Sequence, residues 1–364
     1  MKNLLKYLPR GWQAKAKEKG AMQRDSGVIR TAESLLRLNM LYVTNGGSFQ
    51  MASMGMALTE GIKISKPAAH KRIRNSGPWL RSIAEELCKN EGQIIPKPAF
   101  LGEREVILID ATDEAVKGSK KSDYRLHFGL DLFNFRAKNV ELTTIKEGEK
   151  LTRYTFSKDE IVIADRIYCT MSGIEHVLSQ GSGFVLRFKS KAFILYDENG
   201  ERLDILPLLR HLKALKSTEI QCFYRLAGGE MRPLRLVAMK KTAKAIDETK
   251  RKMKRKTSKK QEKSVQSDTV ELNEYVVLAT NLEYTNEQIL ELYRARWQIE
   301  QVFYRLKSLF GYGDTPCKCD DTVQAWFYGK LLLAALCECI LNRMSFPPEL
   351  EPIITDIVGA QFMG

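Results

Sequence analysis

Two short apolar runs, each followed by an aspartate, most strongly limit what this chain can fold into. Residues 106–109 (Val-Ile-Leu-Ile) precede Asp110, and residues 161–164 (Ile-Val-Ile-Ala) precede Asp165. Unbroken apolar runs of this length are typical of strands buried on both faces of a sheet. Strands that deliver carboxylates to one sheet edge are a common way for α/β folds to build metal and phosphate sites. The repetition therefore predicts an α/β core with both aspartates at one edge.

The chain before these runs is predicted to be helical. Residues 29–43 have helical periodicity, and Gly92–Pro98 contains two prolines and is typical of a linker into the next domain. We therefore expect residues 1–98 to form a helical domain.

Within this domain, residues 48–77 have the outline of a helix-turn-helix. Ser48 is placed to cap a helix over Phe49–Glu60, and Ser65 to cap a second helix that begins at Lys66-Pro67 and ends at Gly77-Pro78. Helical pairs with basic surfaces also occur without a DNA partner, and a lone histidine on a helix is usually structural or solvated. We nevertheless expect DNA contact from the basic positions of the second helix, which are Lys66, His70, Lys71, Arg72 and Arg74.

The rest of the chain is predicted to be one β-rich core in two parts. Residues 99–188 form the first part, in which the strands Tyr124–Leu132 and Asn139–Ile145 follow the first apolar run. Residues 274–344 form the second part, which begins with the strand Tyr275–Ala279 and ends in a buried helix. A β-rich insertion over residues 189–273 separates the two parts, and residues 345–364 are an irregular tail.

The end of the insertion is strongly basic. Residues 240–263 contain twelve Lys or Arg against three acidic residues and lack apolar periodicity. A run of this kind is either a solvated, partly disordered loop or a flexible arm that lies on DNA phosphates.

A third carboxylate lies in the stretch Glu291–Phe310, which has no Gly or Pro and is expected to form one long helix. At about 100° per residue, Tyr293, Arg296, Glu300 and Lys307 share one stripe beside the apolar face of that helix. The stripe fits either a solvated face with an Arg296–Glu300 pair or part of a functional site. Thr285 and Gln288 are spaced as a capping box at its start.

Asp110, Asp165 and Glu300 are far apart in the sequence and can meet only through tertiary structure. Three clustered carboxylates repel one another unless cations neutralise them, and an all-oxygen ligand set favours Mg²⁺ or Mn²⁺ over zinc. Two such ions can activate a water or a 3′-hydroxyl and stabilise the leaving oxygen of a phosphodiester. Arg296 and Lys307 are then placed to hold phosphate, with Tyr293 beside them.

Composition agrees with a nucleic-acid partner. The 58 Lys and Arg outnumber the 44 Asp and Glu, which gives a net charge of +14. The seven cysteines are odd in number and scattered, so a reducing cytoplasm fits better than a disulfide framework. The most apolar segment, Val323–Leu341, is interrupted by polar residues and reads as a buried helix, not a membrane span.

Several of these blocks resemble the DDE transposases of the insertion-sequence-four type, which have an RNase H-like catalytic core. The resemblance covers roughly residues 100–312 and is carried by Leu108-Ile-Asp110-Ala-Thr112, Ala164-Asp165-Arg-Ile-Tyr168, Thr280-Asn281-Leu282 and Tyr293-x2-Arg296-x3-Glu300-x6-Lys307. It implies an α/β fold with an RNase H-like mixed sheet flanked by helices, interrupted by a β-rich insertion and preceded by a helical DNA-binding domain.

By the same resemblance, Asp110, Asp165 and Glu300 are catalytic metal ligands, and Tyr293, Arg296 and Lys307 contact the transposon end. The family usually has glycine where this chain has Ala111, and some members stack a flipped base on a tryptophan that the insertion here lacks. The implied activity is cleavage of double-stranded DNA at element ends and joining to target DNA, by a homodimer in the bacterial cytoplasm at the nucleoid. A non-catalytic repressor of transposition and a stand-alone RNase H-like nuclease are the alternatives.

Overall fold

The computed structural model describes residues 2–23, 27–90, 95–189, 193–260, 267–313 and 315–341. The expected tail 345–364 lies outside these residues, as do residues 92–94 of the expected linker and residues 261–263 of the basic segment. The chain divides into two compact units. The first unit contains residues 1–98, 110–148 and 298–364, and the second contains residues 99–109 and 149–297.

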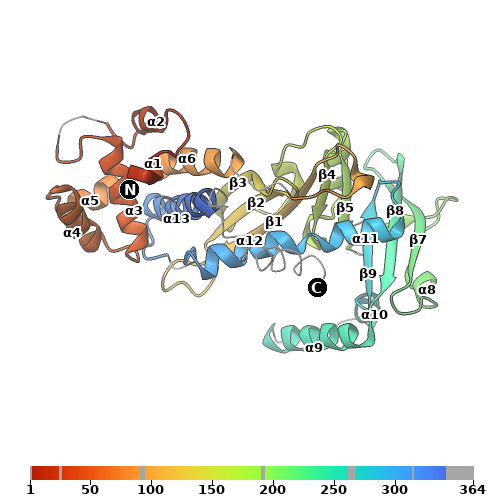
Figure 1. Ribbon diagram of the computed structural model, residues 1–364. Helices are drawn as coiled ribbons and strands as arrows, with labels where there is room; N and C mark the ends of the chain where they lie inside the picture. The colour runs from red at the N-terminus through yellow and green to blue at the C-terminus, as the bar shows by residue number, and fades with distance from the viewer. Residues whose placement is uncertain are drawn as a thin grey trace, which may run out of the picture. The chain divides into compact units, whose positions relative to one another are not determined.

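The first unit is mainly helical (Figure 1). Its helices are α1 (Lys2–Leu5), α2 (Trp12–Glu18), α3 (Ala32–Thr44), α4 (Phe49–Glu60), α5 (Lys66–Arg74), α6 (Gly77–Asn90), α12 (Trp297–Ser308) and α13 (Asp320–Leu341). The antiparallel hairpin β2 (Tyr124–Asp131) and β3 (Arg136–Thr144) completes the unit. The predicted helix pair is confirmed, since the Ser48 side chain accepts from the Met51 N–H and the Ser65 side chain from the Ala68 N–H.

The long apolar helix α13 lies in the core of the first unit. Among the described residues it is the one helix long and apolar enough to cross a membrane, but 61% of its most apolar window is buried. Trp326 is buried and meets the Tyr42 ring edge-on at 5.8 Å between centroids. Gly329 lies so close to Val43 that an added Cβ would come within 2.7 Å of it. The contacts fit the predicted buried helix.

The second unit is built on a mixed sheet. Strand β1 (Val106–Glu114) passes from this unit into the first one at Asp110. The strand order is β1-β4-β5-β9-β8-β7-β6 in the second unit and β3-β2-β1 in the first. Strands β1, β4 (Ile161–Ala164) and β5 (Gly183–Arg187) are parallel, whereas β9 (Tyr275–Thr280) runs antiparallel to β5.

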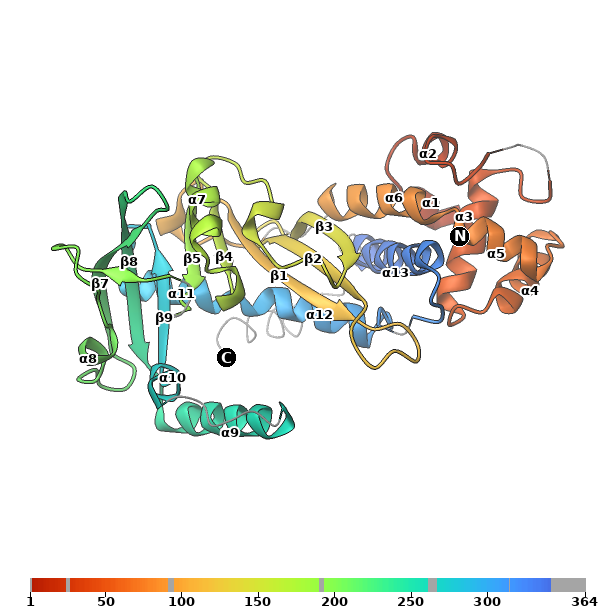
Figure 2. The ribbon, with the colours of Figure 1, turned by 180° about the vertical axis from the view of Figure 1, so that it is seen from behind.

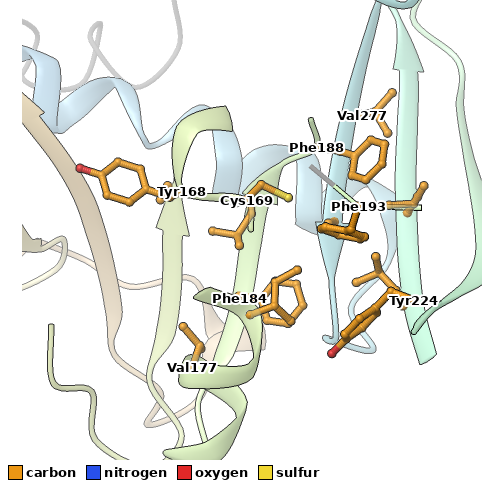
Figure 3. Packing of buried hydrophobic residues seen from close by; sticks show 14 of the residues in the cluster. Tyr168, Cys169, Val177, Phe184, Phe188, Phe193, Tyr224 and Val277 are labelled. Carbon is orange, nitrogen blue, oxygen red and sulfur yellow. The ribbon is translucent and has the colours of Figure 1, made fainter. Parts of the chain in front are cut away.

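The strands of the insertion extend this same sheet. Strand β8 (Met231–Lys240) pairs with β9, β7 (Ser217–Arg225) with β8, and β6 (Leu195–Tyr196) with β7, all antiparallel. One apolar cluster joins core and insertion: in Figure 3, Tyr168 and Val177 of the core lie on the left, Phe184 in the middle, and Phe193 and Tyr224 of the insertion on the right. The insertion is therefore packed into the sheet as part of the core that holds Asp165.

Helices cover both faces of the sheet in the second unit. Helix α7 (Met171–Ser179) is in front in Figure 2, and α11 (Asn286–Arg294) is in front in the opposite view of Figure 1. The remaining elements of the unit are α8 (Leu206–Leu209), α9 (Ala243–Lys260), α10 (Ser267–Leu272) and three 3₁₀ turns, η1 (Ala99–Leu101), η2 (Leu151–Arg153) and η3 (Arg166–Tyr168). The fold is α/β with an RNase H-like mixed sheet.

Two sequence expectations about these elements are wrong. The basic segment was expected to be either a solvated, partly disordered loop or a flexible arm, but residues 243–260 form the helix α9. Its residues are good helix formers, and Asp247 and Glu248 stand four positions before Arg251 and Lys252, the spacing that stabilises a helix. The first apolar strand does not end at its carboxylate either, because β1 continues for four residues past Asp110 to Glu114.

Candidate active site

The two aspartates follow one register pair of the sheet. In the parallel ladder of β1 and β4, Ile109 is opposite Ala164, and Asp110 and Asp165 are the next residues of their chains. Asp110 lies within β1, whereas Asp165 has left β4 and begins the turn η3. Both side chains are half-buried. The Asp110 Oδ1 accepts a hydrogen bond from the Ala111 N–H at 2.9 Å, which fixes one of its oxygens.

In the second unit, Tyr293 and Arg296 are brought to Asp165. The Tyr293 hydroxyl donates to Asp165 Oδ1 at 3.3 Å, and the Arg296 guanidinium lies 5.9 Å from the Tyr293 ring centroid. Burial, and then the charge of Asp165, raise the pKa of the Tyr293 phenol to about 12. The phenol is therefore protonated at neutral pH and remains a donor to the carboxylate.

The expected single helix over Glu291–Phe310 is in fact two helices. Helix α11 ends at Arg294, α12 begins at Trp297, and the Arg296 N–H bonds to the Tyr293 carbonyl at 3.1 Å as in a 3₁₀ turn. The expectation of one continuous helical stripe is therefore wrong. The break was not predicted because no Gly or Pro marks it in the sequence. The capping box of Thr285 and Gln288 at the start of α11 is confirmed.

The break separates the four residues of the stripe into two pairs. Tyr293 and Arg296 belong to the second unit, together with Asp165. Glu300 and Lys307 belong to the first unit, together with Asp110. Glu300 is half-buried in the first turn of α12.

In the first unit, Lys307 is held by the end of β1. Its Nζ lies 2.9 Å from the Glu114 carboxylate and donates to the Asp113 carbonyl at 3.2 Å. The Glu114 side chain is 5% exposed and that of Lys307 is 40% exposed. Gly313 leaves room for this acid, since a Cβ there would lie 2.6 Å from Glu114 Oε2.

Glu114 is a residue that the sequence reading missed, although a signal was present. Side chains alternate along a strand, so residues four apart point to the same face. Once β1 is known to continue past Asp110, Glu114 falls on the face of that aspartate. The strand was expected to stop too early for this spacing to be noticed.

The three acids offer only carboxylate oxygens, which suit a hard divalent cation. They are divided between the units, with Asp110 and Glu300 in the first and Asp165 in the second. Over the residues that the structure describes, no three His, Cys, Asp or Glu side chains form a ready ligand group for a metal ion. The donor chemistry thus fits the predicted metal.

Some basic residues of α5 contact other side chains of the protein, and others are exposed. Arg74 pairs with Asp321 at 2.9 Å, and the His70 ring packs 4.7 Å from that of Phe49 with its Nε2 3.5 Å from the Thr322 hydroxyl. Lys66 and Lys71 are exposed, and Arg72 is half-buried. The exposed lysines are therefore the positions best placed for a polyanion.

Comparisons with known proteins identify the family of this chain. The family described as "Transposase DDE domain" matches residues 101–336, which include all three acids. The protein InsL of insertion sequence element IS186A from Escherichia coli (strain K12) is 29% identical over 351 residues, covering 94% of this chain and 93% of that protein.

Two further relatives are also transposases by name. The transposase for insertion sequence element IS421 from Escherichia coli is 29% identical, with 94% of this chain and 93% of that protein covered. The transposase for IS231F from Bacillus thuringiensis subsp. israelensis is 28% identical, with 61% of this chain and 50% of that protein covered. The chain therefore belongs to the DDE transposases, enzymes that act on DNA and generally use divalent metal ions. The insertion-sequence-four type is compatible with these matches.

Proposed function

We propose that this protein cleaves double-stranded DNA at the ends of an insertion element and joins the exposed 3′-hydroxyl to target DNA, with Asp110, Asp165 and Glu300 as its catalytic residues. The observation that carries the proposal is that Asp110 and Asp165 each directly follow the register pair Ile109–Ala164. Parallel neighbours in a sheet are about 4.8 Å apart, so covalent geometry alone keeps the two positions close.

The ion pair of Lys307 supports the placement of Glu300 in the same site. Glu300 precedes Lys307 by seven residues, about 10.5 Å along a helix, and lies on the same helix face. Asp110 precedes Glu114 by four residues, about 13 Å along a strand, on the same strand face. Lys307 ties α12 to the end of β1 through Glu114 and the Asp113 carbonyl, so Glu300 is expected near the level of Asp110.

The three carboxylates are proposed to hold Mg²⁺ or Mn²⁺, most simply as two ions. A divalent cation bound by these oxygens would polarise the scissile phosphate and lower the pKa of an attacking water or 3′-hydroxyl. The protein's own contribution is to fix the carboxylates on buried strands and a packed helix. The Tyr293 phenol orients Asp165 by donating to one of its two oxygens and leaves the other available.

Tyr293, Arg296 and Lys307 are proposed to contact the element end, and Lys66, His70, Lys71, Arg72 and Arg74 to contact DNA through α5. Guanidinium and ammonium groups bind phosphate oxygens with charge-assisted hydrogen bonds. The basic helix α9 adds a further phosphate-binding surface. Because two ends must be joined in one reaction, we propose a homodimer on the terminal inverted repeats, acting at the nucleoid of a bacterial cytoplasm.

The test is strand cleavage of a duplex made from the DNA that flanks the coding region, with Mg²⁺ present. Asp165→Asn should abolish cleavage and preserve DNA binding. Asp159→Asn is the matched control, because Asp159 is exposed in the same unit and has a φ of 65°, which asparagine also tolerates. Normal cleavage by Asp165→Asn would contradict the assignment.

The same assay separates the alternatives. Binding of the end duplex without cleavage by the unaltered protein would favour a repressor of transposition. Cleavage without joining, and without preference for the end sequence, would favour a stand-alone nuclease.

A further inference from the structure

A cavity of about 210 Å³ in the second unit lies beside the turn that carries Asp165. Cationic side chains on its wall come from Arg166, Arg187 and Lys189, and the wall also includes Phe188, Asn273 and Tyr275. Phe188 also lines the cavity and belongs to the apolar cluster shown in Figure 3. The cavity is thus lined by both cationic and apolar side chains, and none of the roles proposed above uses it.

The cations at this cavity are held in place by neutral partners. Arg166 donates to the Asn273 side-chain oxygen at 3.1 Å, and Arg187 donates to the Tyr275 carbonyl at 2.8 Å. Lys241, just after β8, donates to the Asn273 carbonyl at 2.6 Å and to the Thr249 hydroxyl at 3.3 Å. Each of these partners is uncharged, so the bonds orient the cations without neutralising them.

Over the residues that the structure describes, Arg166, Arg187 and Lys241 form no ion pair with a carboxylate. Burial lowers the pKa of Arg187 to about 10; the charges of Arg166 and Arg296 act in the same direction, and those of Tyr293 and Asp165 oppose it. Burial, and then the charges of Arg187 and Arg166, lower the pKa of Lys241 to about 8. Like charges are therefore crowded into a half-buried space, an arrangement that a bound anion would stabilise.

We propose that this cavity binds a phosphate of the DNA backbone, on the strand whose scissile linkage reaches Asp165. A phosphodiester is the anion that a DNA-processing enzyme meets, and a guanidinium fork matches its oxygens. Arg166 directly follows Asp165, so the phosphate it binds is a near neighbour of the reacting one. The inference rests on the proposed function and adds Arg166, Arg187 and Lys189 as positioning residues for the DNA strand.

A purely structural role for these side chains makes a different prediction. If Arg187 and Arg166 only tie β5 and η3 to the segment around Asn273, their loss should destabilise the protein and weaken DNA binding equally at every linkage. Lys189 separates the two readings further, because it is exposed and can be changed without loss of packing.

The experiment is a scan in which single backbone phosphates of the flanking-DNA duplex are replaced by neutral methylphosphonates, with binding measured without divalent cation. For the unaltered protein, replacing the phosphate at one linkage near the cleavage position should weaken DNA binding roughly tenfold, a change of about 1.4 kcal/mol in binding free energy. In Lys189→Gln and Arg187→Gln, the methylphosphonate at this linkage should hardly weaken binding further. Replacements at the other linkages should have the same effects as they have on the unaltered protein. The slope of log affinity against log salt should also fall by about one.

Lys213→Gln, which removes one exposed charge between α8 and β7, is the control and should keep the full scan pattern. If both cavity variants keep the loss at every linkage seen with the unaltered protein, the phosphate site is overturned and the proposed function stands. If the unaltered protein neither binds nor cleaves the flanking duplex, the proposed function itself fails.

Discussion

Replacement of Lys307 by methionine tests whether this residue only holds DNA or also stabilises the fold. Its Nζ is 2.9 Å from a Glu114 carboxylate that is 5% exposed. Removing one partner of a fully buried pair costs about 3–5 kcal/mol, whereas an exposed pair contributes less than about 1 kcal/mol. Lys307 is 40% exposed, so we expect Lys307→Met to lower the free energy of unfolding by about 1–3 kcal/mol.

The assay is urea unfolding of the DNA-free protein followed by tryptophan fluorescence. Glu114→Gln should lower stability less than Lys307→Met does, because a neutral amide is buried more easily than an unpaired carboxylate. The double variant should be about 1 kcal/mol more stable than the sum of the two single effects predicts. Lys120→Met, an exposed position in the loop after β1, should stay within about 0.5 kcal/mol of the unaltered protein.

Equal unfolding midpoints for Lys307→Met and Lys120→Met would show that the Lys307–Glu114 ion pair does not stabilise the fold. Lys307 would then not stabilise the fold, and its ion pair with Glu114 would no longer support the proposed position of Glu300. A large coupling would instead show that part of any activity lost by Lys307 variants comes from a displaced α12.

Three further outcomes are expected. Gly313→Ala should destabilise the protein by about 1–3 kcal/mol in the same assay, because its Cβ would lie 2.6 Å from Glu114 Oε2, while Gly228→Ala, which meets nothing within 4 Å, should be near neutral. Thr285→Ala should cost about 1 kcal/mol through loss of the α11 capping box, and Thr285→Ser should restore most of it. Burial lowers the pKa of Lys241 to about 8 from its ordinary value of 10.5, so the unfolded chain binds more protons than the folded protein between these two pH values. Across that pH range, the free energy of unfolding of the unaltered protein minus that of Lys241→Met should therefore rise with pH, as unfolding at several pH values can measure. A difference that does not change with pH would contradict the burial of this ammonium group.

Local sequence rules predicted most of the elements that frame the site. The serine caps and prolines gave the bounds of α4 and α5, and the apolar runs gave the paired parts of β1 and β4. These signals act within a few residues, through backbone N–H groups at helix starts and side-chain burial along strands. They were sufficient to predict that Asp110 and Asp165 each directly follow an apolar run that pairs in the sheet.

The errors arose where the expected local signal was absent, or where tertiary contacts determine the structure. The break at Ala295 and Arg296 has no Gly or Pro to signal it, and α9 has charges where periodic apolar residues were sought. Glu114 was missed because β1 was expected to end at Asp110, and Arg187 because the cavity that it lines forms only after β5 and β9 pair. A single sequence carries no local mark of such pairings.

The spacing Tyr293-x2-Arg296-x3-Glu300-x6-Lys307 has a different physical meaning once the helix is known to be broken. Tyr293 and Arg296 act with Asp165, through a phenol that donates to the carboxylate and a guanidinium over the same ring. Glu300 and Lys307 act with the face of β1 that carries Asp110 and Glu114. Tyr293 and Arg296 thus lie in the unit of Asp165, and Glu300 and Lys307 in the unit of Asp110; the helix break at Ala295 and Arg296 comes just before the boundary between the units, which follows Trp297. We therefore expect the spacing from Tyr293 to Lys307 to reflect two local sets of contacts, one in each unit, and not one continuous helix face.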